Sequence, residues 1–184
     1  METPLRSTRH ARQGAFCNDT HDFPNRRERV HASLAAYYAF DIVPSFWPKI
    51  VELAADGRIV TVDSVRDEIL RGRDRLAGWI ITDFPQSAIA GTKTDPSVVQ
   101  AVGAIMNWVY GPGQVFTPDA IHDFAGGADP WLIAYAIAHN SCVVTHETFQ
   151  PEIRRKVPIP NVCQAFGVAY VNTFSMMRDL SVSI

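Results

Sequence analysis

Short runs of β-branched residues alternate with helical segments along most of this chain, and this alternation limits the folds open to it. Residues 58–62 (RIVTV) form a short β-branched strand, residues 141–145 (SCVVT) are an apolar run of the kind found in buried parallel strands, and residues 168–171 form a third predicted strand. Strands that alternate with helices imply right-handed crossovers and a parallel sheet. The pattern therefore predicts a single α/β domain.

Helix boundaries are set by capping residues, prolines and glycines. Asp95-Pro96 and Thr117-Pro118 have the order of cap and first-turn proline that begins a helix, and Gly57 follows a predicted helix as its left-handed stop. Ser64 is predicted to cap the helix after RIVTV. The predicted helices cover residues 44–55, 64–72, 74–81, 95–110, 117–124, 129–139, 161–166 and 173–180.

The first 31 residues differ in composition from the rest of the chain. They contain six arginines and almost no periodic apolar pattern, so a disordered or poorly packed segment is expected over residues 1–31. From about Ala32 onward the apolar pattern becomes consistent, which places the folded domain at residues 32–184.

Charge and cysteine content restrict the functional classes. The net charge is -2 and the pI is near 6.3, so bulk positive charge does not attract nucleic acid, and any RNA contact is expected to be local or metal-assisted. Cys17, Cys142 and Cys163 form no CxxC pair, and Cys142 and Cys163 are expected to be buried thiols. With no secretory signal and no apolar stretch near the ~20 residues of a membrane span, a cytoplasmic protein is expected.

Three acidic residues stand where strands give way to helices. Glu68 lies early in the helix after RIVTV, Asp129 at the start of the helix before SCVVT, and Glu147 just beyond Thr145 at the end of SCVVT. Sites in parallel α/β folds gather at the carboxyl ends of the strands. Carboxylate oxygens there are suited to Mg²⁺ or Mn²⁺, ions that stabilise phosphodiester chemistry.

Each of these residues also has a purely structural interpretation. Asp129 before Pro130 has the position of a helix N-cap, which taken alone is the better explanation. Glu68 alone would be a solvated helix glutamate, and Glu147 alone a loop acid. Composition and spacing leave these alternatives open.

A match of ordered blocks favours the site interpretation. The segments VTVDSVRDEILRG, ADPWLIAYAIAHNSCVVTHE and VPIPNVCQAFGVAYVNTF resemble successive blocks of PIN-domain proteins, and most closely a small bacterial PIN-like family of unassigned function. A YY-x-F-D-x-x-P-x-F-W block of that family is present here as Tyr37, Tyr38, Phe40, Asp41, Pro44, Phe46 and Trp47. The resemblance covers the chain from about Tyr37 onward.

This resemblance implies a three-layer α/β/α fold around a mainly parallel sheet, with an acidic Mg²⁺ or Mn²⁺ site that cleaves single-stranded RNA. By position, Glu68, Asp129 and Glu147 match metal-binding acids of the family, and Thr145 matches a residue that orients the last acid or a metal-bound water. Many PIN proteins are toxins of toxin–antitoxin pairs and many are dimers, so a cognate antitoxin and a homodimer are implied partners, without a membrane.

One part of the family pattern is missing. PIN proteins begin with an apolar strand that ends in a metal-binding aspartate, and counting back from Tyr37 puts that position near Arg26, in the run PNRRERVHAS, where no acidic strand end stands. We hypothesise a frameshift or a wrong start codon, which the DNA upstream of the Ala32 codon would test. Without the first strand, the sheet would lose both a ligand and its centre.

Two functions therefore follow from the sequence. The first is a metal-dependent PIN-type endoribonuclease, and the second is a catalytically impaired PIN-like scaffold that binds RNA or a protein partner. Basic residues that follow Glu68, namely Arg71, Arg73 and Arg75, are candidates to line an RNA path, with solvated helix ends as the alternative. His146 is a weaker candidate for a phosphate contact, and His139 is favourable at a helix end through the helix dipole alone.

Overall fold

The structure is a computed structural model that describes residues 39–182 together with the backbone of Glu28–Arg29. The strands are β1 (Glu28–Arg29), β2 (Ile59–Val62), β3 (Ile89–Ala90), β4 (Cys142–Val144) and β5 (Tyr170–Val171). The helices are α2 (Phe46–Ala55), α3 (Asp63–Gly72), α4 (Arg75–Thr82), η1 (Gln86–Ala88), α5 (Pro96–Val109), α6 (Pro118–Gly126), α7 (Asp129–Ala138), α8 (Ile159–Phe166) and α9 (Thr173–Asp179). The predicted mixed α/β chain with a parallel sheet is confirmed, and it is mostly helical.

The five strands form one small parallel sheet in the order β3-β2-β1-β4-β5. β1 lies at the centre, where Glu28 is paired with Ile59 of β2 on one side and with Cys142 of β4 on the other. Because all neighbouring pairs are parallel, the carboxyl ends of all five strands meet at one edge of the sheet. We call this the carboxyl edge.

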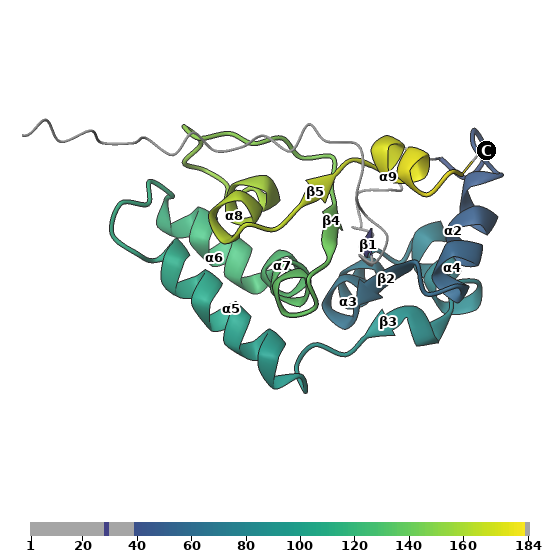
Figure 1. Ribbon diagram of the computed structural model, residues 1–184, viewed down its shortest axis with the longest axis horizontal. Helices are drawn as coiled ribbons and strands as arrows, with labels where there is room; N and C mark the ends of the chain where they lie inside the picture. Colours follow the sequence, from purple (N-terminus) through teal and green to yellow (C-terminus); the bar gives the residue numbers. More distant parts are fainter. Residues whose placement is uncertain (1–27, 30–38, 183–184) are drawn as a thin grey trace, which may run out of the picture.

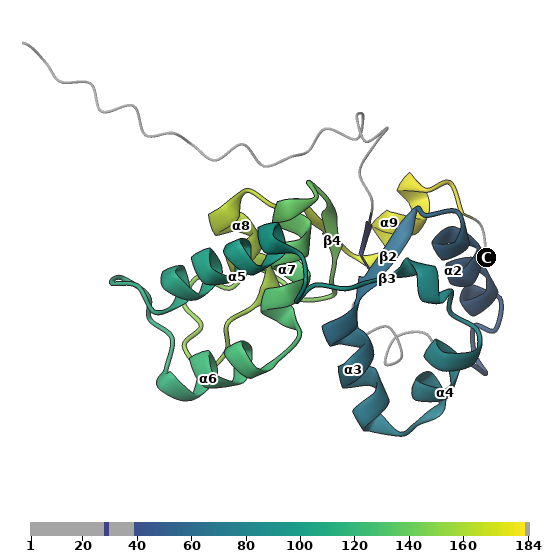
Figure 2. The same ribbon diagram turned by 90° about the horizontal axis from the view of Figure 1, so that it is seen from below.

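Helices cover both faces of the sheet, since side chains alternate between faces along a strand. Val60, Val62 and Val143 belong to a core built mainly with α5, α7 and α8, whereas Ile59 and Val144 belong to a second core with α2, α4 and α9. Figures 1 and 2 show these helix groups on opposite sides of the strands. The continuous burial of residues 59–62 and 141–145 thus comes from two helical layers.

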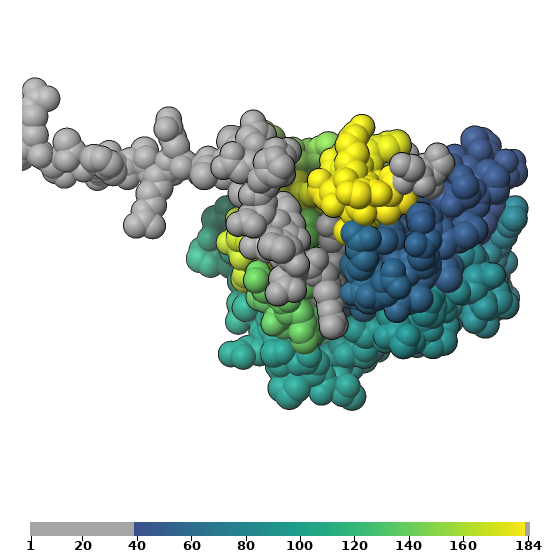
Figure 3. All heavy atoms as spheres, turned by 45° about the vertical axis from the view of Figure 1, so that its right-hand side comes forward, coloured from purple at the N-terminus to yellow at the C-terminus, as the bar shows by residue number. Residues whose placement is uncertain are grey.

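The C-terminal helix α9 closes the second core. Met176 is fully buried there together with Phe46 and Ile50 of α2. The Arg58 side chain donates to the Leu180 carbonyl at 3.0 Å, which connects the chain after α9 to the start of β2. In Figure 3, α9 lies against the region of α2 and β2.

The structure corrects three expectations. The chain does have a first strand, because Glu28–Arg29 pair at the centre of the sheet although their sequence is polar. β3 lies in a stretch that the sequence predicts as loop, because two residues carry too little pattern to indicate a strand. Ser64 does not cap α3, which begins at Asp63 with Val62 as its N-cap residue. The remainder of the segment 1–31 lies outside the described residues.

The described helices are short. The longest, α5, has 14 residues, fewer than the ~20 that a bilayer requires. Within the part of the chain that the structure describes, no helix has the length and apolar character to cross a membrane.

Core truncation should reveal how much stability α7 contributes. Leu132 is fully buried between α7 and the sheet, so Leu132→Ala is expected to lower the free energy of unfolding by about 3 kcal/mol, through lost apolar burial and the cavity left behind. Urea denaturation followed by circular dichroism measures this loss. Val99→Ala on the exposed face of α5 is the control, expected to change stability by about 0.5 kcal/mol or less.

Candidate functional site

Polar residues follow the described strands at the carboxyl edge. β2 is followed by Asp63, β3 by Gly91 and Thr92, β4 by Thr145 and β5 by Asn172. The residue after β1 is Val30, and the first acidic residue after Arg29 is Asp41. No acid directly follows the central strand, although Glu28 lies within the strand itself.

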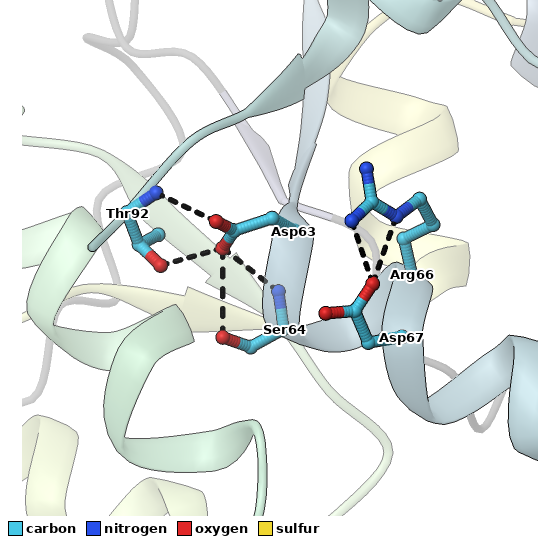
Figure 4. A network of polar contacts seen from close by, with 5 residues as sticks. All are labelled: Asp63, Ser64, Arg66, Asp67 and Thr92. Atoms are coloured by element: carbon cyan, nitrogen blue, oxygen red, sulfur yellow. Dashed lines mark hydrogen bonds and ion pairs between the residues drawn. The ribbon is translucent and has the colours of Figure 1, made fainter. Parts of the chain in front are cut away.

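Asp63 joins the ends of β2 and β3. Its Oδ1 accepts from the Thr92 hydroxyl at 2.5 Å and from the Ser64 N–H at 2.8 Å, while its Oδ2 accepts from the Thr92 N–H at 3.1 Å (Figure 4). Partial burial acts to raise the pKa of Asp63, but the hydrogen bonds from Thr92 and Ser64 and the charge of Lys93 outweigh it and hold the pKa below its ordinary value. The sequence analysis missed this residue, although an acid directly after a predicted strand is a signal for it.

Glu68 connects α3 to the start of α7. Its Oε1 accepts from the Ala128 backbone N–H at 2.6 Å, across 60 residues of sequence. The contact is tight enough that a Cβ added at Gly127 would lie 3.4 Å from the same oxygen. Glu68 is therefore not an ordinary solvated helix glutamate, because its carboxylate satisfies a backbone donor at a helix N-terminus.

Asp129 is the first residue of α7 rather than its N-cap. The N-cap residue is Ala128, whose own side chain makes no capping hydrogen bond. The capping interpretation of Asp129 is thus wrong, because the chain enters the helix one residue earlier than Asp129-Pro130 suggests. Asp129 is half-buried and lies next to the residue that Glu68 binds.

Glu147 is bound on both carboxylate oxygens. Oε2 accepts from the Ile159 N–H at 2.8 Å at the start of α8, and Oε1 forms an ion pair with Lys156. The Glu147 N–H in turn donates to the Thr145 hydroxyl at 3.1 Å, and Thr145 is buried. Thr145 therefore orients the backbone of Glu147, while Glu147 holds the N-terminus of α8.

Cys163 of α8 is a buried thiol. Burial raises its pKa far above the ordinary value, and negative charge on Cys142, Asp129 and Glu147 acts in the same direction. Cys142 and Cys163 are buried free cysteines, as predicted, while Cys17 lies outside the described residues.

The three predicted metal ligands do not form one tight cluster. The Glu68 carboxylate and Asp129 lie at the start of α7, and the Glu147 carboxylate lies at the start of α8. Among the described residues, no group of three or more His, Cys, Asp or Glu side chains is arranged to hold a metal ion. The donor chemistry nevertheless fits Mg²⁺ or Mn²⁺, because these ions bind through one or two carboxylates and retain several waters. The assignment of Glu68, Asp129 and Glu147 as metal ligands stays a prediction.

The other sequence candidates have structural partners. His139 Nε2 contacts Asp95 Oδ2 at 2.9 Å, and His146 Nε2 contacts the buried Thr173 hydroxyl at 2.9 Å. Phe46 and Trp47 are buried in the second core. Trp131 is half-buried and packs against the first core, but it also lines a surface cleft beside Glu68.

The sequence of the chain matches the model of one protein family. Residues 30–184 match the family model described as Domain of unknown function (DUF4411), so the chain is a member of that family. No curated protein matches it. Among solved structures it is similar to VapBC2 from Rickettsia felis bound to a DNA fragment from their promoter, with 13% sequence identity and a TM-score of 0.48, over 79% of this chain and 97% of that chain.

The bond between Asp63 and Thr92 should make stability depend on pH in acid. Because folding lowers the pKa of Asp63 from 3.8, its contribution is fully present above the unfolded pKa and is lost as the pH falls through the folded pKa. Asp63→Asn should therefore flatten the decline of the unfolding free energy, measured in urea titrations, from about pH 5 to about pH 3. Thr92→Val should lower stability by about 1 kcal/mol at neutral pH, and an unchanged acid profile in Asp63→Asn would contradict this assignment.

Removal of Glu147 should destabilise α8 through its N-terminus. Glu147→Ala leaves the Ile159 N–H without its acceptor and is expected to cost about 0.5–2 kcal/mol, whereas Glu147→Gln keeps an acceptor oxygen and should cost less. Lys156→Ala removes only a half-exposed ion pair, worth about 0–1 kcal/mol. Urea denaturation of the three variants gives the ranking, and an equal loss in Glu147→Ala and Lys156→Ala would show that the cap contributes nothing.

Proposed function

We propose that the chain is a metal-dependent endoribonuclease of the PIN type that cleaves single-stranded RNA. The observation that carries the proposal is the contact of the Glu68 carboxylate with the Ala128 N–H, which brings α3 to the start of α7 where Asp129 stands. These two acids come from sequence blocks that resemble the PIN pattern. The central parallel sheet with helices on both faces agrees with the three-layer build that the resemblance implies.

Glu68 and Asp129 are the side chains that would hold Mg²⁺ or Mn²⁺, with Glu147 as a third carboxylate. Such an ion supplies charge stabilisation for the phosphodiester and a more acidic bound water. Glu68 Oε2 accepts no hydrogen bond from any described residue, so it is the oxygen left for a ligand. Thr145 fixes the backbone of Glu147, and Glu147 would have to exchange Lys156 or the α8 N–H for an ion.

The biological setting follows from the same resemblance. The chain would be the toxin of a bacterial toxin–antitoxin pair, acting in the cytoplasm and bound by a cognate antitoxin, and it would form a homodimer as many PIN proteins do. These partners are part of the proposal and rest on the sequence blocks alone.

Substitution of the two central acids should abolish metal-dependent cleavage. Glu68→Gln and Asp129→Asn are each expected to lower the rate of cleavage of a labelled single-stranded RNA in Mn²⁺ by about 100-fold or more, the scale of losing one group that acts on the transition state. Initial rates from gel-resolved products measure the effect. Asp119→Asn is the matched control, since Asp119, like Asp129, lies next to a proline in the first turn of a helix, here α6, and its side chain is exposed.

Two results would decide against this function. Cleavage that persists unchanged in both Glu68→Gln and Asp129→Asn would place the activity elsewhere or in a contaminant. Cleavage that does not depend on added Mn²⁺ and survives EDTA would exclude a metal-dependent reaction at these acids.

The second candidate is a catalytically impaired PIN-like scaffold that binds RNA or a protein partner. Two observations favour it. Along the chain, no acid follows the central strand β1 until Asp41, and the third carboxylate, Glu147, is already paired with Lys156. A folded wild-type chain that binds single-stranded RNA without cutting it, in Mg²⁺ or in Mn²⁺, would select this candidate over the ribonuclease.

A further inference from the structure

A small cleft lies directly beside Glu68 and contains two cationic side chains, although the chain as a whole has a net charge of -2. It has a volume of about 90 Å³ and is formed by α3, the loop after β3 and the start of α7. Its lining residues are Ser64, Asp67, Glu68, Arg71, Lys93, Gly126, Gly127, Ala128 and Trp131. We infer that Arg71 and Lys93 hold a backbone phosphate of the nucleic acid strand in this cleft, with RNA as the strand under the function proposed above.

One acid of the cleft is paired with an arginine and the other accepts a backbone hydrogen bond, whereas no such partner is found for its two cations. Asp67 Oδ1 accepts from Arg66 at 2.6 Å and 3.0 Å, and Glu68 accepts from the Ala128 N–H. For Arg71 and Lys93, no ion pair or hydrogen bond to another described residue is found, and both are exposed. The cleft therefore presents two unpaired positive charges to an anion.

The position of Lys93 is fixed by the carboxyl edge. It follows Thr92, whose N–H and hydroxyl are both bound to Asp63, and Thr92 is fully buried. Arg71 comes from the last turn of α3, two turns from Asp63 on the same helix. Two anchored segments that are distant in sequence thus bring one cation each to the cleft, which limits the loss of conformational freedom on binding.

The structure also separates Arg71 from the neighbouring arginines that the sequence grouped with it. The Arg75 guanidinium lies 4.5 Å from the centre of the Phe40 ring, over the second core, and Arg73 is the left-handed residue that ends α3. Of the three, only Arg71 lines the cleft. A phosphate there would lie next to Glu68, so the cleft would hold the strand beside the proposed metal ligand.

Salt-dependent binding tests this inference without requiring cleavage. Fluorescence anisotropy of a labelled 12-nucleotide single-stranded RNA is measured in EDTA over a range of salt concentrations, for Arg71→Gln, Lys93→Gln and the double variant. Each lost phosphate contact should reduce the slope of log K against log salt by about 0.7, and the double variant by roughly 1.4. Arg155→Gln is the matched control, because Arg155 is exposed in the loop before α8 and does not line the cleft.

The outcomes distinguish this inference from the proposed function. Slopes that fall in the two cleft variants and not in Arg155→Gln support it, even if the wild-type chain cuts no RNA. It is overturned if the slope of the double variant equals that of the wild type, or if the folded wild-type chain binds no RNA in low salt. RNA cleavage that continues normally in the double variant with unchanged binding would keep the ribonuclease and remove the cleft from it. Circular dichroism confirms that each variant is folded.

Discussion

Parallel pairing around a central first strand is the constraint on which the rest of this structure depends. β1 contributes only Glu28–Arg29 to the sheet, yet it is hydrogen-bonded to both β2 and β4 and thereby holds the two halves of the sheet together. Because every pair is parallel, each connection must cross over a face, which puts helices on both faces and all carboxyl ends at one edge. The two apolar cores and the polar edge are both consequences of this pairing.

At the carboxyl edge, each acid has a structural contact as well as a candidate chemical role. Asp63 joins the ends of β2 and β3, Glu68 receives the Ala128 N–H, and Glu147 receives the N–H that opens α8. Helix N-termini and strand ends leave backbone donors without partners, and carboxylates satisfy them at little desolvation cost near the surface. A site built from such residues gains rigidity, but each ligand must share its oxygens between the fold and a bound ion.

The partners of the acids around the cleft also explain how a chain with net charge -2 could bind an anion there. The acids nearest to the cleft are bound by Arg66 or by a backbone N–H, so their charge is partly compensated, while Arg71 and Lys93 keep theirs. Screening limits the reach of surface charges to about 8 Å at physiological salt, so this local balance matters more than the total.

The sequence by itself determined the α/β class, the parallel sheet, most helix boundaries and the burial of SCVVT, because these follow from apolar runs, from apolar periodicity and from caps such as Asp95-Pro96. It did not reveal β1 or β3, since two-residue strands are specified by their neighbours and not by a pattern of their own. It also could not determine which oxygen of Glu68 or Glu147 is engaged, or that Arg71 and Lys93 meet across a cleft. Those facts depend on contacts between segments 12 to 60 residues apart, which only the tertiary structure brings together.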